Sequence, residues 1–166
     1  KFEAHDRPLT SKIILDEKIM TKEIWQKVSD AALKLFARGQ EIALKQGLIL
    51  VDTKYEFGLT PDMEVMLIDE IHTPDSSRYW QAKTYEKRIA DGLEPENFDK
   101  EFLRLWFKQN CDPYKDKVMP PAPPEMVEEL SRRYIQIYEQ ITGDTFKSET
   151  GDIEKRIENN LKKYTI

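Results

Sequence analysis

Cysteine is nearly absent from this sequence: Cys111 is the one cysteine among 166 residues, so no disulfide can form within the chain. With no histidine or second cysteine beside it, we interpret Cys111 as structural rather than nucleophilic. The sequence also has no long apolar run of membrane-spanning length and no signal-peptide pattern. These absences lead us to expect a cytoplasmic protein without a membrane partner.

Basic charge is outweighed by acidic charge, with 26 Lys and Arg residues against 31 Asp and Glu and a net charge of -5. There is no clustered basic face of the kind that binds a nucleic-acid backbone, so we expect no nucleic-acid partner. This balance does not argue against a small phosphorylated substrate, because the local placement of Lys and Arg decides such binding. The sequence also contains no Walker phosphate loop, dinucleotide-binding fingerprint or zinc-ligand spacing.

The apolar residues that are present follow helical and strand patterns. A chain of 166 residues with 39% hydrophobic content is long enough to bury a core as one domain. Apolar residues at three- and four-residue spacing predict an amphipathic helix over residues 21–46, with Thr21 as its cap and Gly47 at its end. Similar patterns predict helices over residues 12–18, 99–109 and 124–142, and a final one capped by Asp152.

Two β-rich runs follow the first long helix. Residues 48–57 and 64–71 predict two strands joined by a tight connection as a hairpin. On the first strand, the period of two places Asp52, Lys54 and Glu56 on one face. Three ionisable side chains therefore share one side of the predicted hairpin.

Glu56 and Asp69, one on each predicted strand, form the first candidate site. Carboxylate oxygens from neighbouring strands are ligands that Mg²⁺ accepts while water and ATP phosphates fill its remaining positions. The alternative is a solvated face of an antiparallel sheet, where alternating charges are common. The residue types alone leave both interpretations open.

Further polar side chains follow the second strand. Asp75, Ser77 and Arg78 lie in a turn rich in Thr, Pro and Ser, where an Arg could grip a carboxylate or phosphate by two parallel bonds. Lys100 and Arg104 lie one helical turn apart and could clamp a phosphate together. The alternatives are an ordinary surface turn and the solvated face of a helix.

Near the start of the chain, His5 and Asp6 precede Arg7 and Pro8 in a segment without periodicity, which favours a loop. Asp6 could be another metal ligand. An ordinary loop pair is the alternative, because a lone His-Asp pair is common in loops.

Two longer motifs carry a resemblance to a known family. Residues 52–58 have the sequence DTKYEFG, and residues 69–78 have the sequence DEIHTPDSSR. Taken in order, they resemble the two signatures of the SAICAR synthase (phosphoribosylaminoimidazole-succinocarboxamide synthase) family. Ile71 and His72 fall in a variable part of the second signature, and we assign them no role.

The resemblance implies an α+β fold in which an antiparallel hairpin or sheet is flanked by helices. This would be the C-terminal part of the SAICAR synthase-like, ATP-grasp-like fold over residues 1–146, followed by a helical C-terminal extension over residues 147–166. It also implies roles for single residues. The metal ligands would be Asp6, Glu56 and Asp69, the catalytic residue beside the nucleotide Lys54, and the substrate-binding residues Asp75, Ser77, Arg78, Lys100 and Arg104.

The family joins the carboxylate of carboxyaminoimidazole ribonucleotide to the amino group of L-aspartate, and converts ATP to ADP and phosphate. The resemblance therefore implies a ligase of purine biosynthesis that uses Mg²⁺ and ATP. The family's N-terminal region, with its ATP phosphate-binding segment, has no counterpart here. Since the chain also begins at Lys1 without methionine, we expect an inactive piece of a longer polypeptide. A non-catalytic binding or interaction domain is the alternative function, and association of identical copies stays open.

Overall fold

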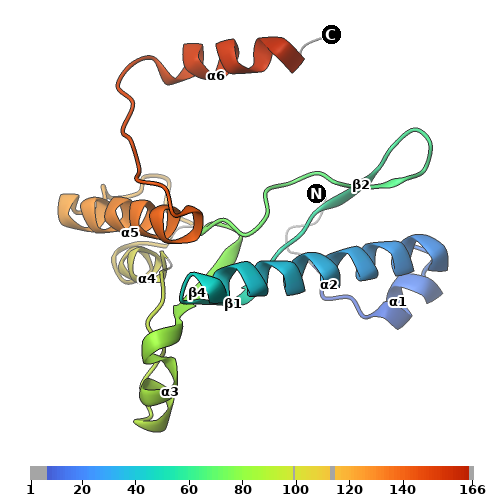
Figure 1. The fold of residues 1–166 in the computed structure, drawn as a ribbon, viewed down its shortest axis with the longest axis horizontal. Coiled ribbons are helices and arrows are strands. Elements are labelled where there is room, and N and C mark those ends of the chain that lie inside the picture. The colour runs from blue at the N-terminus through green and yellow to red at the C-terminus, as the bar shows by residue number, and fades with distance from the viewer. Residues whose placement is uncertain (1–6, 99, 113–114, 165–166) are drawn as a thin grey trace.

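The computed structural model describes residues 7–98, 100–112 and 115–164 of the chain (Figure 1). Within these residues, two small antiparallel sheets lie among helices, which confirms the predicted α+β class. The elements in chain order are α1 (Ser11–Asp16), α2 (Lys22–Lys45), β1 (Leu48–Thr53), β2 (Phe57–Leu59), β3 (Val65–Leu67), β4 (Ser77–Gln81), α3 (Ala82–Ala90), α4 (Glu101–Asn110), α5 (Pro124–Thr142), α6 (Ile153–Leu161) and the short 3₁₀ helix η1 (Lys162–Tyr164).

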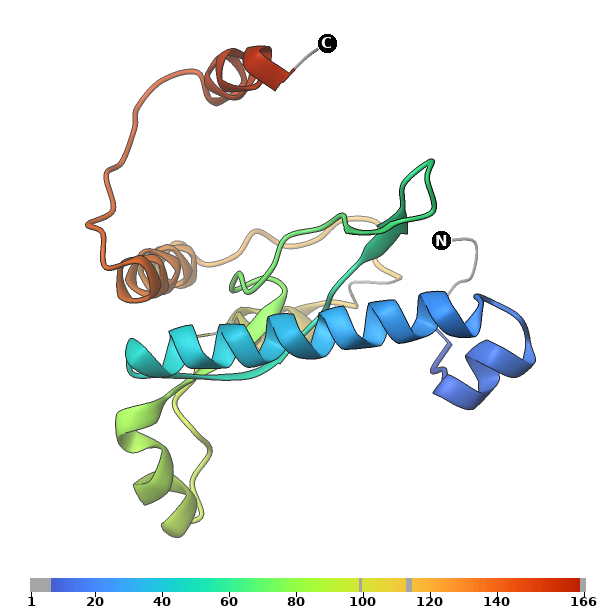
Figure 2. The same ribbon diagram turned by 45° about the vertical axis from the view of Figure 1, so that its right-hand side comes forward.

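Helix α2 begins and ends close to where the sequence predicts. The Thr21 hydroxyl accepts a hydrogen bond from the backbone N–H of Ile24 at 3.3 Å, as an N-cap side chain does. Gly47 follows the helix with a φ of 73°, a left-handed conformation that glycine adopts without steric cost. The helix packs along β1 and reaches β3, so one long element supports both sheets (Figure 2).

The predicted hairpin over residues 48–57 and 64–71 is only partly correct. Its tip forms as predicted, because β2 pairs with β3 in an antiparallel register. The first half of the predicted strand is instead β1, which pairs with β4, a strand that the sequence pattern did not predict. The backbone changes partner between the two sheets: Lys54 N–H donates to the Ser76 carbonyl, and the Glu56 carbonyl accepts from Ile68 N–H.

An irregularity in β1 decides which side chains face the core. The register of the β1–β4 pair shifts between Leu50 and Asp52, so β1 contains one residue more than the matching part of β4. Cross-strand partners share a face, and Leu50 faces Tyr79 while Thr53 faces Ser77. Without the extra residue, Asp52 would lie on the same face as buried Leu50.

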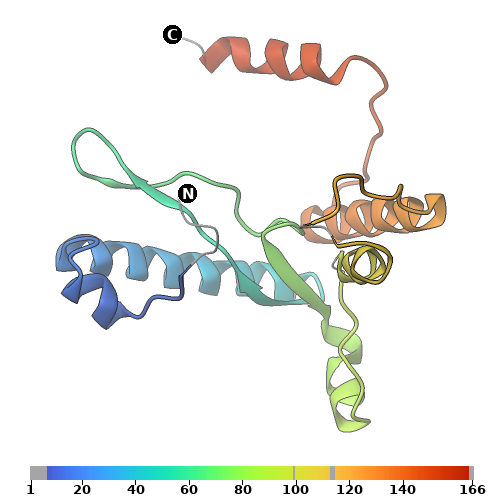
Figure 3. The same ribbon diagram turned by 180° about the vertical axis from the view of Figure 1, so that it is seen from behind.

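The core lies where α2, the β1–β4 pair and α5 meet (Figure 3). Its buried members are Ala43, Leu48, Leu50, Tyr79, Phe98 and Ile137, with Phe36 and Ile141 packed against them. Leu48 and Leu50 are the best-shielded strand residues, with 0% and 1% of their surface exposed. The buried residues of the β1–β4 sheet therefore pack with residues of α2 and α5, two helices far apart in the sequence.

Helices α5 and α6 also follow the sequence pattern. Helix α5 begins at Pro124, and Gly143 ends it in a left-handed conformation with a φ of 75°. The Asp152 side chain caps α6 by accepting from the N–H of Lys155 at 3.1 Å. In all three views α6 stands apart from the remainder of the chain, and its residues are exposed. None of the described helices is long and apolar enough to cross a membrane.

Candidate functional site

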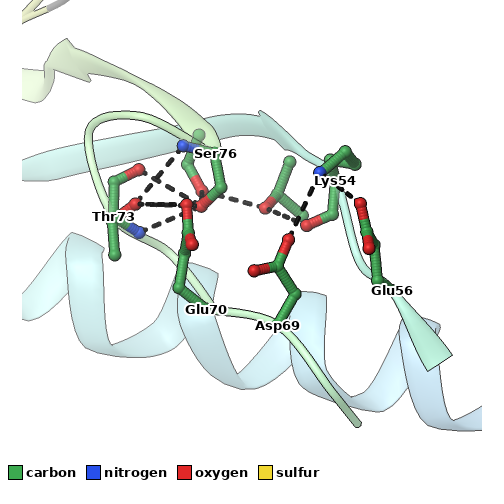
Figure 4. Close-up of polar contacts among 8 residues, drawn as sticks. Lys54, Glu56, Asp69, Glu70, Thr73 and Ser76 are labelled. Atoms are coloured by element: carbon green, nitrogen blue, oxygen red, sulfur yellow. Dashed lines mark hydrogen bonds and ion pairs between the residues drawn. The ribbon is translucent and has the colours of Figure 1, made fainter. Parts of the chain in front are cut away.

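Lys54 joins the two carboxylates that the sequence predicts as metal ligands. Its Nζ donates to Glu56 Oε1 at 2.6 Å and lies 3.2 Å from Asp69 Oδ2 (Figure 4). Lys54 and Glu56 lie in the stretch between β1 and β2, whereas Asp69 follows β3. The pairing of β2 with β3 brings these segments together. The two predicted carboxylates therefore lie close together, and both contact Lys54.

Lys54 and Asp69 each stabilise the charged form of the other side chain. The pKa of Lys54 lies above its ordinary value of 10.5, because the ammonium donates first to Glu56 and then to Asp69. The pKa of Asp69 lies below its ordinary value of 3.8, first because the Glu70 backbone N–H donates to it and then because Lys54 does. At neutral pH, Lys54 is therefore positively charged and Asp69 is ionised.

The donor set suits a divalent cation that also binds phosphate oxygens. Two carboxylates already converge on one positive group, and Mg²⁺ is commonly held by one or two carboxylates plus water and substrate phosphates. Among the residues that the structure describes, no three or more metal-ligating side chains gather in one place. Asp6, the third predicted metal ligand, lies with His5 outside the described residues.

The loop before β4 is shaped by its own hydroxyl groups (Figure 4). The Ser76 and Ser77 backbone N–H groups donate to the Thr73 carbonyl at 3.2 and 2.9 Å, and the Ser76 hydroxyl accepts from Thr73 N–H at 3.2 Å. Ser77 is buried, with 6% of its surface exposed, and its Oγ lies 2.9 Å from the Thr53 hydroxyl. The predicted turn is confirmed, but the Ser77 hydroxyl already has a partner in β1.

Asp75 joins this loop to the residue that precedes α4 and to helix α5. Its Oδ1 accepts from Lys100 Nζ at 2.5 Å and from Tyr134 Oη at 2.8 Å. The two hydrogen bonds hold the pKa of Asp75 below its ordinary value of 3.8, with Lys100 as the larger cause and Tyr134 as the next. The structure therefore brings two predicted substrate-binding residues together and adds Tyr134, whose part the sequence did not indicate.

Arg78 and Arg104 are placed differently from one another. Arg78 Nε donates to both carboxylate oxygens of Asp52 at 2.9 and 3.0 Å, and the two side chains are partners in the β1–β4 register. Because successive residues of a strand point to opposite faces, Arg78 and Ser77 do not share one face of β4. Arg104 lies one turn beyond Lys100 in α4 with an exposed side chain.

His72, to which the sequence assigned no role, lies at the centre of a second cluster behind the site. Its Nε2 is 2.6 Å from the Tyr55 hydroxyl, and its backbone carbonyl accepts from the Tyr79 hydroxyl at 2.6 Å. Burial lowers the pKa of the His72 imidazole below its ordinary value of 6.5. No sequence pattern distinguishes this histidine, because its partner Tyr55 lies 17 residues before it and Tyr79 lies on the following strand.

Tyr134→Phe tests the Asp75 cluster, since it keeps the ring and removes one donor. We expect the pKa of Asp75 to rise toward 3.8, because a carboxylate that loses a donor is easier to protonate. The pKa of the folded state is depressed, so the contact stabilises the protein above the unfolded carboxyl's pKa. That stabilisation is lost as pH falls through the folded value.

The measurement is a carbon-detected NMR titration of the Asp75 carboxyl group. Tyr138→Phe is the matched control, because Tyr138 lies on the same helix and contacts the Phe146 ring instead of Asp75. An identical Asp75 pKa in Tyr134→Phe and in the unmodified protein would contradict the role of this hydrogen bond.

Comparison with known proteins places the chain in a family. The family model described as SAICAR synthetase matches residues 1–121, which include both motifs and the Lys54 cluster. The chain belongs to the SAICAR synthetase family. The phosphoribosylaminoimidazole-succinocarboxamide synthase of Legionella pneumophila (strain Paris) is 54% identical over 162 residues, which cover 96% of this chain and 52% of that protein. The chloroplastic enzyme of the same name from Arabidopsis thaliana is 60% identical over 139 residues, covering 84% of this chain and 34% of that protein.

Solved structures of the family share the fold. A SAICAR synthase from Saccharomyces cerevisiae complexed with SAICAR superposes with a TM-score of 0.61 at 32% identity, over 76% of this chain and 41% of that one. A SAICAR synthetase in complex with ADP superposes with a TM-score of 0.59 at 27% identity, over 85% of this chain and 47% of that one. The chain thus spans about half the length of the Legionella relative and less than half of each of these two solved chains.

Proposed function

We propose that this chain forms the metal- and substrate-binding part of a ligase that joins L-aspartate to carboxyaminoimidazole ribonucleotide at the expense of ATP. The observation that carries the proposal is the convergence of Glu56 and Asp69 on Lys54. Membership of the SAICAR synthetase family supports it, as do the SAICAR and ADP complexes of the two solved relatives. The products are SAICAR, ADP and phosphate.

The proposed chemistry is acyl transfer through a phosphorylated carboxylate. A carboxylate is a poor acceptor for an amine, so one substrate oxygen first takes the γ-phosphoryl group of ATP and ADP leaves. The aspartate amine then attacks the acyl carbon, the C–N bond forms, and the C–O bond to phosphate breaks as the amine loses its proton. The protein contributes chiefly positioning and charge stabilisation in such a reaction.

Each residue of the Lys54 cluster has a part in this scheme. Glu56 and Asp69 hold Mg²⁺, which when bound neutralises charge on the phosphate oxygens. Lys54 lies between the two carboxylates and is cationic, so it supplies a positive charge beside the nucleotide. Asp6 completes the metal ligands in this proposal.

The substrate anions are held by the residues that follow β3. Asp75 and Ser77 orient hydrogen-bonding groups of the substrates, and Lys100, Arg78 and Arg104 bind their carboxylate or phosphate groups. Lys100 and Arg78 already have carboxylate partners, Asp75 and Asp52 respectively. Substrate binding at these two cations therefore exchanges a protein carboxylate for a substrate carboxylate or phosphate.

Activity also requires the part of the relatives that this chain does not span. A groove of about 1100 Å³ lies between α1, the start of α2, and β2, with apolar lining that includes Ile24, Val28 and Phe57. The groove lies beside Glu56, because Tyr55 and Phe57 on either side of that residue line it. This position suits a packing surface for the part that the chain does not span, which makes up roughly half of the Legionella relative. Covering such a groove removes apolar surface from water and stabilises the association.

The test is ADP release by the natural polypeptide in its full length, beside residues 1–166 alone. Each assay contains Mg²⁺, ATP, L-aspartate and carboxyaminoimidazole ribonucleotide, and the controls omit one component at a time. We expect ADP only from the longer protein and only with all components. ADP release that is independent of L-aspartate, or none at all, would favour a non-catalytic binding domain.

A further inference from the structure

The Tyr55–His72 hydrogen bond connects the two segments that carry the candidate metal ligands. Tyr55 lies between Lys54 and Glu56, and His72 comes three residues after Asp69. The Tyr55 hydroxyl is 2.6 Å from His72 Nε2, and the two rings meet edge to face with centroids 5.7 Å apart. The Tyr55–His72 hydrogen bond therefore links the segment that carries Glu56 to the segment that carries Asp69.

Tyr55 points to the other side of the chain from the two charged neighbours. Side chains alternate along an extended segment, so Tyr55 and Lys54 face opposite ways. Tyr55 lines the apolar groove against α2, whereas Lys54 bonds to Glu56 and Asp69. The bond to His72 thus lies behind the charged cluster, on the side covered by helix α2.

The His72 imidazole rests directly on a glycine of α2. Gly39 is buried, and a methyl group built there would lie 2.3 Å from His72 Cε1 and 2.7 Å from Nδ1. Glycine inside a helix costs about 1 kcal/mol relative to alanine, so nothing in the helix itself favours it at this position. What Gly39 provides is room for the imidazole ring.

The ring has little freedom to move away from Gly39. Its Nε2 is bonded to Tyr55, its backbone carbonyl accepts from the Tyr79 hydroxyl, and its φ is 56°. A left-handed φ is uncommon for a residue with a side chain and is kept only where surrounding contacts hold it. His72 is therefore held from three directions, by α2, by the Tyr55 segment and by β4.

We propose that His72 is a positioning residue that, seated on Gly39 and bonded to Tyr55, sets the spacing of Glu56 and Asp69 and thereby the affinity for a divalent cation. The inference about cation affinity rests on the proposed function, whereas the contact between His72 and Gly39 does not. Groups behind metal ligands commonly change metal affinity by about 10- to 100-fold when they are removed.

The seat is tested by a double-mutant cycle in the full-length natural polypeptide, using Gly39→Ala, His72→Ala and the two together. With His72 present, we expect Gly39→Ala to lower the melting temperature, because the new methyl group meets the ring. With His72→Ala, the three atoms nearest to the new methyl group are gone, and the gain in helix propensity should raise the melting temperature by about 2 °C. If Gly39→Ala changed the melting temperature in the same direction with and without His72, the proposed contact between His72 and Gly39 would be overturned.

The effect on the cation is tested with Tyr55→Phe, which removes the hydroxyl and keeps the ring. Mn²⁺ binding in the presence of ADP, followed by electron paramagnetic resonance, should weaken about tenfold, as should the Mg²⁺ dependence of ADP release. The rate at saturating Mg²⁺ should stay within about twofold, since the reacting groups are unchanged. Tyr85→Phe is the matched control, because Tyr85 stacks on Trp80 in α3 and β4.

The outcomes separate this inference from the proposed function. Unchanged Mn²⁺ affinity in Tyr55→Phe would overturn the positioning role while leaving the ligase proposal intact. No Mn²⁺ binding by the unmodified protein would overturn the cation part of both proposals. The melting-temperature cycle would still decide whether His72 is seated on Gly39.

Discussion

Asp69→Asn should lower the rate of ADP formation by about 100-fold, roughly 2.7 kcal/mol of transition-state stabilisation. The change removes a charge at nearly constant shape from one of two carboxylates that converge on Lys54. An amide oxygen is a weaker ligand for Mg²⁺ than a carboxylate, so the charge on the phosphates would be less well neutralised. The measurement is the initial rate of ADP release by the full-length polypeptide with all substrates at saturation.

The control for this prediction is the same chemical change at an ordinary position. Asp62 is an exposed residue in the turn between β2 and β3, and Asp62→Asn should leave the rate within about twofold. Both variants should keep the melting temperature of the unmodified protein within about 2 °C, since neither side chain is buried in the core. Unchanged turnover in Asp69→Asn would remove this residue from the metal site.

Ile137→Ala should lower the free energy of unfolding by about 2–5 kcal/mol, the usual range for truncating a fully buried aliphatic side chain. Ile137 has 1% of its surface exposed and is the one residue of α5 in the buried core cluster. The variant loses buried apolar surface and leaves a cavity between α5 and the β1–β4 sheet. Chemical denaturation of the full-length polypeptide, with a midpoint and slope for each variant, measures the loss.

The matched control lies on the same helix. Val127 has 51% of its surface exposed, so Val127→Ala should change the free energy of unfolding by less than about 0.5 kcal/mol. Because α5 also carries Tyr134, loosening it should weaken the Tyr134 bond to Asp75 as well. Equal stability losses in the two variants would show that α5 is not anchored through Ile137.

Helices and their ends were predictable because their signals are local. Thr21 caps α2 and Asp152 caps α6, each through a backbone N–H three residues further on. Gly143 ends α5 with the left-handed conformation that a glycine at this position favours. In each case, the residue and the group that it contacts lie within one helical turn of each other.

Strand β4 and helix α3 were not predicted, and for β4 the reason is the absence of a local signal. Of the five residues of β4, Ser77 and Tyr79 face the core, and both carry a hydroxyl group. Their burial depends on pairing with β1, where Thr53 is the partner of Ser77 and Leu50 is the partner of Tyr79. The same pairing explains why β1 leaves the predicted hairpin, since its two buried leucines need this sheet and not the β2–β3 tip.

By itself, the sequence determined the spacing of Lys54 and Glu56 and the motifs that place the chain in its family. Alternation along an extended segment directs these two side chains to one side, whatever the remainder of the fold does. Only the tertiary structure decided that Lys54 contacts Asp69, that Asp75 meets Lys100 and Tyr134, and that His72 rests on Gly39. Each of these contacts joins segments 15 to 59 residues apart, and chain folding rather than residue spacing sets such distances.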